Sequence, residues 1–149
     1  MSAGEYCNRE VVVITRSGSV REAVALMRQY HVGTVVVVDD EASPPVPRGI
    51  LTDRDIVLEI LAKDLDLDSV TVGDVINSEL VSVHETTELL DAVELMRTKG
   101  VRRLPVVNNA GGLVGILTLD DVIDLLAEML GNITRLLRNE QHHEQLRRA

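Results

Sequence analysis

The chain has 149 residues, of which 45% are hydrophobic and 26% charged, a composition typical of one globular domain or two very small ones. Its net charge of −9 and its lack of Trp and Phe disfavour nucleic acid as the main partner, because phosphate is repelled and stacking platforms are scarce. One cysteine, Cys7, excludes an intrachain disulfide, and no run resembles a signal peptide or membrane span, so we expect a cytoplasmic protein.

The first half of the chain predicts the element order β-α-β-β-α. Ser19 followed by Glu22 is a capping-box pattern at the start of an amphipathic helix. Short aliphatic runs on either side of this helix are typical of strands, and a helical pattern closes the unit. These runs are, in order, "VVVI" at 11–14, "TVVVV" at 34–38, "RGIL" at 48–51 and the closing "DRDIVLEILA" from residue 53.

The second half repeats the first. Residues 80–109 align with residues 11–40 at an offset of 69, and "GILTLDDVI" at 115–123 aligns with "GILTDRDIV" at 49–57 at an offset of 66. A unit of about 55 residues buries too little apolar surface to be stable alone. We therefore predict an α/β (α+β) fold of tandem β-α-β-β-α units whose small mixed sheets pack face to face. The expected boundaries are repeat 1 at 8–64, a linker at 65–78 with a short helix over 72–77, repeat 2 at 79–130 and a C-terminal extension at 131–149.

The repeated Thr-x-x-Asp pattern has two interpretations. Thr52 with Asp55, and Thr118 with Asp121, each fit a capping box at a helix start. A third instance, beginning at Thr71 in the linker, favours the cap. The first two pairs, however, follow a buried strand, where a helix N-terminus can bind phosphate and a carboxylate can accept ribose hydroxyls. A cap and a ligand site are compatible.

The duplicated unit, with "VRRLPVV" at 101–107 and "GILTLDD" at 115–121, resembles a pair of CBS domains, the module named after cystathionine β-synthase. The resemblance covers the chain from about Val11 to about Leu130. The first repeat departs from the pattern, because it has "GTVVVV" in place of "RRLPVV". The resemblance implies a regulatory, energy-sensing module without a required cofactor, which binds AMP, ADP, ATP or S-adenosylmethionine in two clefts and signals to an unidentified partner.

Ten positions are ligand-binding candidates by this resemblance. It implies that the aspartates hold ribose, the threonines reach phosphate or sugar, four aliphatic side chains line the base, and two arginines bind phosphate. The candidates are Asp55 and Asp121, Thr52 and Thr118, Ile50, Ile116, Val12 and Val81, and Arg102 and Arg103. The arginines could instead form a solvated positive strand edge. Because the first repeat has Gly33 and Thr34 at their positions, we expect unequal phosphate binding in the two clefts.

We find no nucleophile, metal cluster or Gly-rich fingerprint and therefore predict that the chain is not an enzyme. The alternative function is a ligand-free dimerisation scaffold. The helices over 56–62 and 122–130 have more aliphatic residues than one sheet face needs, which predicts a homodimer like the disc-like dimers of CBS pairs.

Gly131 is expected to end the second helix. The extension then forms a separate helix with a thin apolar stripe, which serves as a dimer strap or partner handle, or is a solvated, frayed end.

Overall fold

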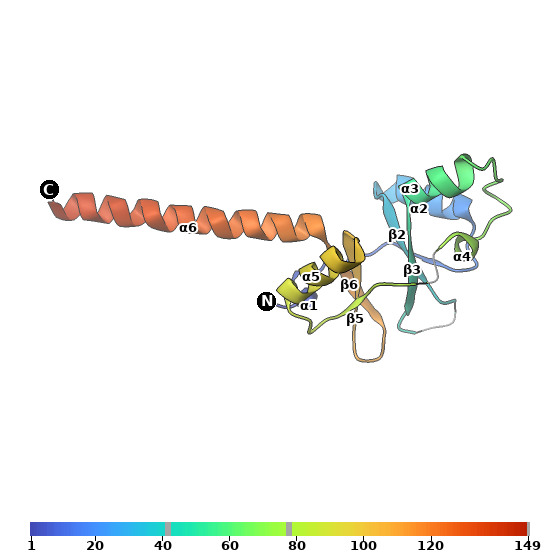
Figure 1. Cartoon of the computed structure of the whole chain (residues 1–149), viewed down its shortest axis with the longest axis horizontal. Coiled ribbons are helices and arrows are strands. Elements are labelled where there is room, and N and C mark those ends of the chain that lie inside the picture. The colour runs from blue at the N-terminus through green and yellow to red at the C-terminus, as the bar shows by residue number, and fades with distance from the viewer. Residues whose placement is uncertain (41–42, 77–78, 149) are drawn as a thin grey trace.

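The computed structural model describes residues 1–40, 43–76 and 79–148. Two small sheets lie side by side, and one long helix projects from the second of them (Figure 1). The first sheet has the order β1-β2-β3 and the second β4-β5-β6, each with one parallel and one antiparallel pairing. The elements are α1 (Ala3–Tyr6), β1 (Val13–Thr15), α2 (Val20–Tyr30), β2 (Thr34–Val38), β3 (Pro47–Thr52), α3 (Asp53–Ile56), the π-helical η1 (Val57–Leu61), α4 (Val72–Val75), β4 (Val83–His84), α5 (Leu89–Lys99), β5 (Arg103–Val107), β6 (Leu113–Thr118) and α6 (Leu119–Arg148).

The predicted start of α2 is confirmed in atomic detail. The Glu22 amide donates to Ser19 Oγ at 3.1 Å, and the Ser19 amide donates to Glu22 Oε2 at 3.2 Å, which completes the capping box. The helix ends at His31, a left-handed residue with φ of 53°, and its counterpart α5 ends at Gly100 with φ of 67°. The duplication is therefore visible in helix boundaries as well as in strand order.

Each repeat has its own aliphatic core. In the first, α2 and η1 cover one face of the sheet, with Val20, Leu51 and Ile60 fully buried. In the second, α5 and the start of α6 take these places, and Leu104 and Leu117 are fully buried. The predicted α+β fold of two small mixed sheets is confirmed.

The short helices α1 and α4 are exchanged between the repeats: each packs on the repeat that it does not precede in sequence. Helix α1 precedes the first repeat but packs on the second sheet, where the Ala3 amide donates to the Thr87 carbonyl at 2.8 Å and Ala3 is fully buried. Helix α4 precedes β4 but packs on the first repeat, where the Val72 amide donates to the Gly18 carbonyl at 2.8 Å. Each core therefore contains a segment from outside its own β-α-β-β-α unit, and the sequence did not predict α1.

Glycine in the repeated GILT motif leaves room for these crossing segments. A Cβ on Gly115 would lie 2.6 Å from both the Asn8 carbonyl oxygen and Cys7 Sγ. A Cβ on Gly49 would lie 2.9 Å from Ile76 Cδ1. Distances under about 3 Å require movement, so both glycines are set by close packing rather than by backbone conformation.

The predicted end of the second closing helix at Gly131 is wrong. Helix α6 runs through this glycine and ends at Arg148, with 30 residues in all. A glycine ends a helix when it adopts a left-handed conformation; inside a helix it only weakens the helix, by about 1 kcal/mol relative to alanine.

Two other boundaries also differ from the expected ones. Strand β1 begins at Val13, two residues after the expected start, and α4 ends at Val75, with Asn77 of the expected span outside the described residues. None of the helices in the described ranges is both long enough and apolar enough to cross a membrane.

Candidate functional site

The two strand-to-helix corners are helix caps. At the first, the Thr52 amide donates to Asp55 Oδ2 at 2.9 Å and the Asp55 amide donates to Thr52 Oγ1 at 3.2 Å. At the second, the corresponding distances between Thr118 and Asp121 are 3.4 and 3.1 Å. No hydrogen bond from the described part of the chain reaches the Oδ1 atom of either aspartate, so each carboxylate has acceptor capacity beyond the cap.

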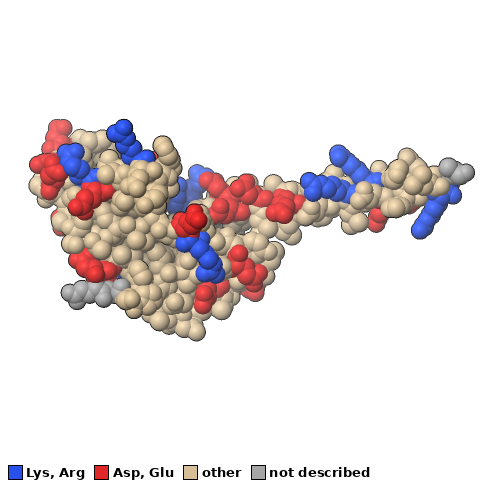
Figure 2. All heavy atoms as spheres, turned by 180° about the vertical axis from the view of Figure 1, so that it is seen from behind, with Lys and Arg blue, Asp and Glu red and all other residues tan. Residues whose placement is uncertain are grey.

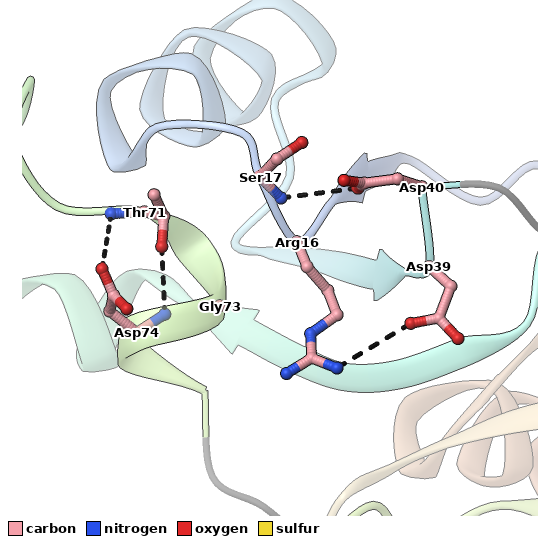
Figure 3. Close-up of a pocket in the computed structure, with 7 residues that line it drawn as sticks. All are labelled: Arg16, Ser17, Asp39, Asp40, Thr71, Gly73 and Asp74. Carbon is pink, nitrogen blue, oxygen red and sulfur yellow. Dashed lines mark hydrogen bonds and ion pairs between the residues drawn. The ribbon is translucent and has the colours of Figure 1, made fainter.

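The linker provides a third cap with the same geometry. The Thr71 amide donates to Asp74 Oδ2 at 3.2 Å, and the Asp74 amide donates to Thr71 Oγ1 at 3.3 Å (Figure 3). Capping is therefore common to all three Thr-x-x-Asp pairs, as the spacing predicts. Any ligand role must come from the surroundings of the first two pairs.

A cavity of about 220 Å³ lies where the two sheets meet, beside the second corner. It contains four of the ten predicted residues: Val12, Arg103, Ile116 and Thr118. The other lining residues come from the crossing N-terminal segment and from the start of β2: Asn8, Glu10, Val11, Val32, Gly33, Thr34 and Val36. The cavity therefore combines the second repeat's GILT strand with the segment that precedes β1 and with the start of β2.

A second hollow of about 190 Å³ adjoins this cavity, because Arg103 and Thr118 line both. Its other walls are Arg102, Leu119 and Asp120 at the start of α6. Together the two spaces reach the range of roughly 300–1,000 Å³ that small-molecule sites occupy.

The second hollow is suited to an anion. Arg103 is half-buried and makes no ion pair with the residues that the structure describes, whereas Arg102 is exposed and lies 3.6 Å from Asp120 (Nη2 to Oδ1). The N-terminus of a helix concentrates unpaired amide donors and partial positive charge, and α6 begins here. An uncommitted guanidinium and this helix end therefore attract negative charge to the same place.

The main cavity also contains an unsatisfied hydroxyl. Thr34 Oγ1 is buried and has no hydrogen-bond partner among the described residues. A buried polar group left unpaired costs about 1–3 kcal/mol, so such groups usually have a partner, such as a water or a ligand. Because Thr34 lines the cavity, a polar ligand group there would remove this cost.

The first corner is different. Gly33 and Thr34 occupy the positions of Arg102 and Arg103, and a Cβ on Gly33 would lie 3.0 Å from Asp53 Oδ2. An acidic group thus stands where the second corner has arginine. The predicted residues Ile50, Thr52, Asp55 and Val81 do not line the two spaces described above, and neither does Asp121, although all five are half-buried.

Sequence reasoning missed the polar residues of the crossing segment. Asn8 exchanges two backbone hydrogen bonds with Ile116, both 2.9 Å long, and this pairing holds the segment at the cavity. Beyond Glu10 and Val11, an open groove of about 570 Å³ continues along α2 past Leu26 and Tyr30. No local pattern marks Asn8 or Glu10, because their position depends on the exchange of α1 between repeats.

A larger hollow lies elsewhere and is acidic. It has a volume of about 810 Å³ and contains Asp39, Asp40 and Asp74 with a single arginine, Arg16, which pairs with Asp39 at 3.9 Å (Figure 3). Three carboxylates repel phosphate. Size alone therefore does not make this hollow the nucleotide site.

Two duplicated sheets with a cavity at their junction define a paired-repeat α+β protein. A sequence model of the CBS domain matches residues 3–62 and 72–128. The chain belongs to the CBS domain family and contains two copies of the domain.

Relatives and solved structures agree with this assignment. The CBS domain-containing protein YhcV of Bacillus subtilis is 38% identical over 121 residues, which cover 81% of this chain and 82% of YhcV. The CBS domain protein PAE2072 from Pyrobaculum aerophilum, solved in complex with AMP, is 29% identical with a TM-score of 0.73, over 81% of this chain and 89% of that one. The cytosolic domain of the Mg²⁺ channel MgtE, solved in complex with ATP, is 28% identical with a TM-score of 0.70, over 83% of this chain and 48% of that one.

Proposed function

We propose that the chain is a non-catalytic regulatory module that binds an adenosine nucleotide in the cavity beside the second corner and signals to a partner protein. The observation that carries the proposal is the convergence of Arg103, Thr118 and the unsatisfied Thr34 hydroxyl on one largely apolar cavity. The AMP and ATP complexes of PAE2072 and MgtE support an adenosine ligand. The expected location remains the cytoplasm.

Each residue of the second corner and its cavity has a distinct proposed role. Val12 and Ile116 flank the base, and Thr118 reaches phosphate or sugar. Asp121 does not line the cavity but forms the cap beside it, and it accepts ribose hydroxyls through Oδ1 while Oδ2 keeps the cap. Arg103 binds the phosphate together with the start of α6. In a second, pseudo-symmetric cleft the corresponding roles fall to four equivalent residues: Val81, Ile50, Asp55 and Thr52. Arg102 assists phosphate binding at the second corner.

The charges near the second corner favour a monophosphate. Arg103 is the uncommitted cation, Arg102 already lies near Asp120, and Glu10 adds a negative charge to the cavity wall. A triphosphate has more negative charge and needs more cationic groups or a metal ion. We therefore rank AMP above ADP, ATP and S-adenosylmethionine as the regulatory ligand, and the weaker phosphate site is the one at the first corner, beside Thr52 and Asp55.

The test separates the ligand role of the aspartates from their cap role. In an Asp55→Asn, Asp121→Asn double variant the caps persist, because asparagine still accepts a hydrogen bond and the cap changes stability by about 1 kcal/mol or less. AMP at 100 times its dissociation constant stabilises the wild type by about 2.7 kcal/mol per site, which raises the melting temperature. We expect this rise to disappear in the double variant.

The matched control is Asp74→Asn, which alters a cap of the same geometry away from the cavity. It should keep the full AMP-induced rise. If the double variant keeps the rise as well, the two aspartates are caps only and the proposed ligand contacts are wrong.

We also propose that the chain is a homodimer. Apolar side chains of η1 remain exposed in the single chain: Val57 at 52%, Leu58 at 49% and Leu61 at 56%. The exposed apolar side chains of α6 form a second such surface, and a hexameric CBS-CP12 protein among the structural neighbours supports assembly.

These surfaces also favour the second candidate function, a ligand-free dimerisation scaffold. Unchanged melting with AMP, ADP, ATP and S-adenosylmethionine, together with a dimer in light scattering, would support the scaffold.

A further inference from the structure

Helix α6 extends well beyond the two repeats without support from its own chain (Figure 1). Its 30 residues correspond to about 45 Å at 1.5 Å per residue. Only Val122 of this helix is buried in the body of the molecule. Isolated helical segments are marginally stable in water, and Gly131 weakens this one further. A projecting helix of this length therefore needs a packing partner.

One face of α6 is apolar over half of its length, from Ile123 to Leu137. Ile123, Leu126, Leu130, Ile133 and Leu137 alternate at spacings of three and four residues, the a and d pattern of a coiled coil. Met129 and Leu136 widen this face. All seven side chains are 40–65% exposed. We call this face the α6 stripe.

We propose that the α6 stripe packs against the α6 stripe of a second copy, with the two helices antiparallel. The inference rests on the proposed homodimer and specifies its contact surface. If two sets of seven half-exposed aliphatic side chains are buried, roughly 1,000 Å² of apolar surface leaves water. This area reaches the approximate lower limit of about 1,000 Å² for a specific interface.

The charge distribution along α6 favours the antiparallel orientation. The part next to the body has four acidic residues and no basic ones: Asp120, Asp121, Asp124 and Glu128. The distal part has four arginines against two glutamates: Arg135, Arg138, Arg147 and Arg148 against Glu140 and Glu144. The space-filling view shows red at the root of the projecting helix and blue further out (Figure 2). An antiparallel pair therefore places net negative charge beside net positive charge.

The ends of the stripe give a second argument. Glu140 and Glu144 continue the a and d spacing beyond Leu137. In a parallel pair each glutamate would face its own copy in the seam, and like charges in direct opposition are destabilising. In an antiparallel pair no glutamate faces its own copy in the seam, although the glutamates of one helix then lie beside the acidic root of the other.

The register follows from pairing a positions with d positions. When the two-fold axis lies between residues 131 and 132, Leu130 is level with Ile133 of the second copy, and Leu126 with Leu137. Glu128 is level with Arg135 of the second copy, but both of these lie on the face opposite the stripe. The two-fold axis that pairs the apolar residues thus also places the acidic half of each α6 helix beside the basic half of the other.

Disulfide crosslinking of the full chain tests this arrangement. Cys7 is first replaced by serine, and Leu126→Cys and Leu137→Cys chains with different tags are co-expressed and oxidised. The antiparallel register predicts a Leu126→Cys to Leu137→Cys heterodimer. It predicts no Leu126→Cys homodimer, because two copies of residue 126 lie 11 residues apart along the axis, about 16 Å, and a disulfide needs Cα atoms within about 7 Å. The matched control is the pair Glu128→Cys and Arg135→Cys, which has the same axial level on the opposite face and should not crosslink.

Each outcome either supports or overturns the inference. A heterodimer from the 126 and 137 pair alone supports it. A Leu126→Cys homodimer indicates parallel helices, and equal crosslinking by the control pair indicates random collision; both overturn it. A dimer in light scattering with no crosslink overturns the α6 pairing but leaves the homodimer, whereas a monomer overturns both. Nucleotide binding is measured separately by melting, so its failure is not confused with these results.

Discussion

Replacing Arg103 by threonine gives the second repeat the residue that the first repeat has at the same position, Thr34. Arg103 is the half-buried, uncommitted cation of the proposed phosphate site. A charge-assisted hydrogen bond contributes about 1.5–3 kcal/mol, so its loss should weaken AMP binding by roughly 10- to 150-fold. The free energy of unfolding should change little, because Arg103 makes no ion pair with described residues. Threonine is also a good strand former, and β5 begins at this residue.

Isothermal titration calorimetry with AMP and with adenosine measures this effect. Adenosine lacks the phosphate, so its affinity should be the same for wild type and Arg103→Thr. Arg28→Thr removes the same charge from the exposed face of α2 and should leave both affinities unchanged. An Arg103→Thr variant that loses adenosine and AMP affinity equally, or that keeps both, would refute the assignment of Arg103 to the phosphate.

Three substitutions and one chemical modification further test the fold and the cavity. Gly131→Ala should stabilise α6 by up to about 1 kcal/mol, measured by circular dichroism during melting, because, apart from the adjoining helix backbone, no atom of the described residues lies within 4 Å of the added Cβ. Gly115→Ala should destabilise the fold by about 1–3 kcal/mol in urea titration, because its Cβ meets the Asn8 carbonyl; an unchanged midpoint would contradict the packing role. Thr34→Val should raise the melting temperature of the free protein and weaken AMP binding, and a loss of stability would contradict an unpaired hydroxyl. Burial raises the pKa of the Cys7 thiol, so its alkylation by iodoacetamide at pH 7 should be slower than in the urea-unfolded chain, as mass spectrometry can measure.

The duplication and the helix starts could be predicted because they depend on local patterns. Thr52 and Thr118 are followed three residues later by aspartate, and both pairs form the predicted caps. Four of the predicted ligand residues also share one cavity, at the junction of the two sheets. Whether those residues bind a ligand remains a prediction.

The crossing segment could not be predicted from such patterns. Helix α1 has four residues, too few for a periodic signal, and its burial depends on a sheet more than 80 residues away. The one available signal was the offset of 69, which extends to Ser2 and Thr71 and aligns Gly4 with Gly73. For α1 a local signal was missing, whereas for α6 a local signal was overridden. The residues on both sides of Gly131 favour a helix more strongly than one glycine disfavours it.

The exchange of α1 and α4 has a consequence for how each repeat completes its core. A single repeat whose leading segment extended in this way would complete its core with the segment of a second molecule, which is the arrangement of a domain-swapped dimer. In this chain both repeats belong to one polypeptide, so the swap is an intramolecular contact. The second repeat, expressed without residues 1–8, would lack the buried Ala3 and the strand pairing at Asn8. The two repeats therefore depend on each other to complete their cores, and the cavity lies at the junction between them.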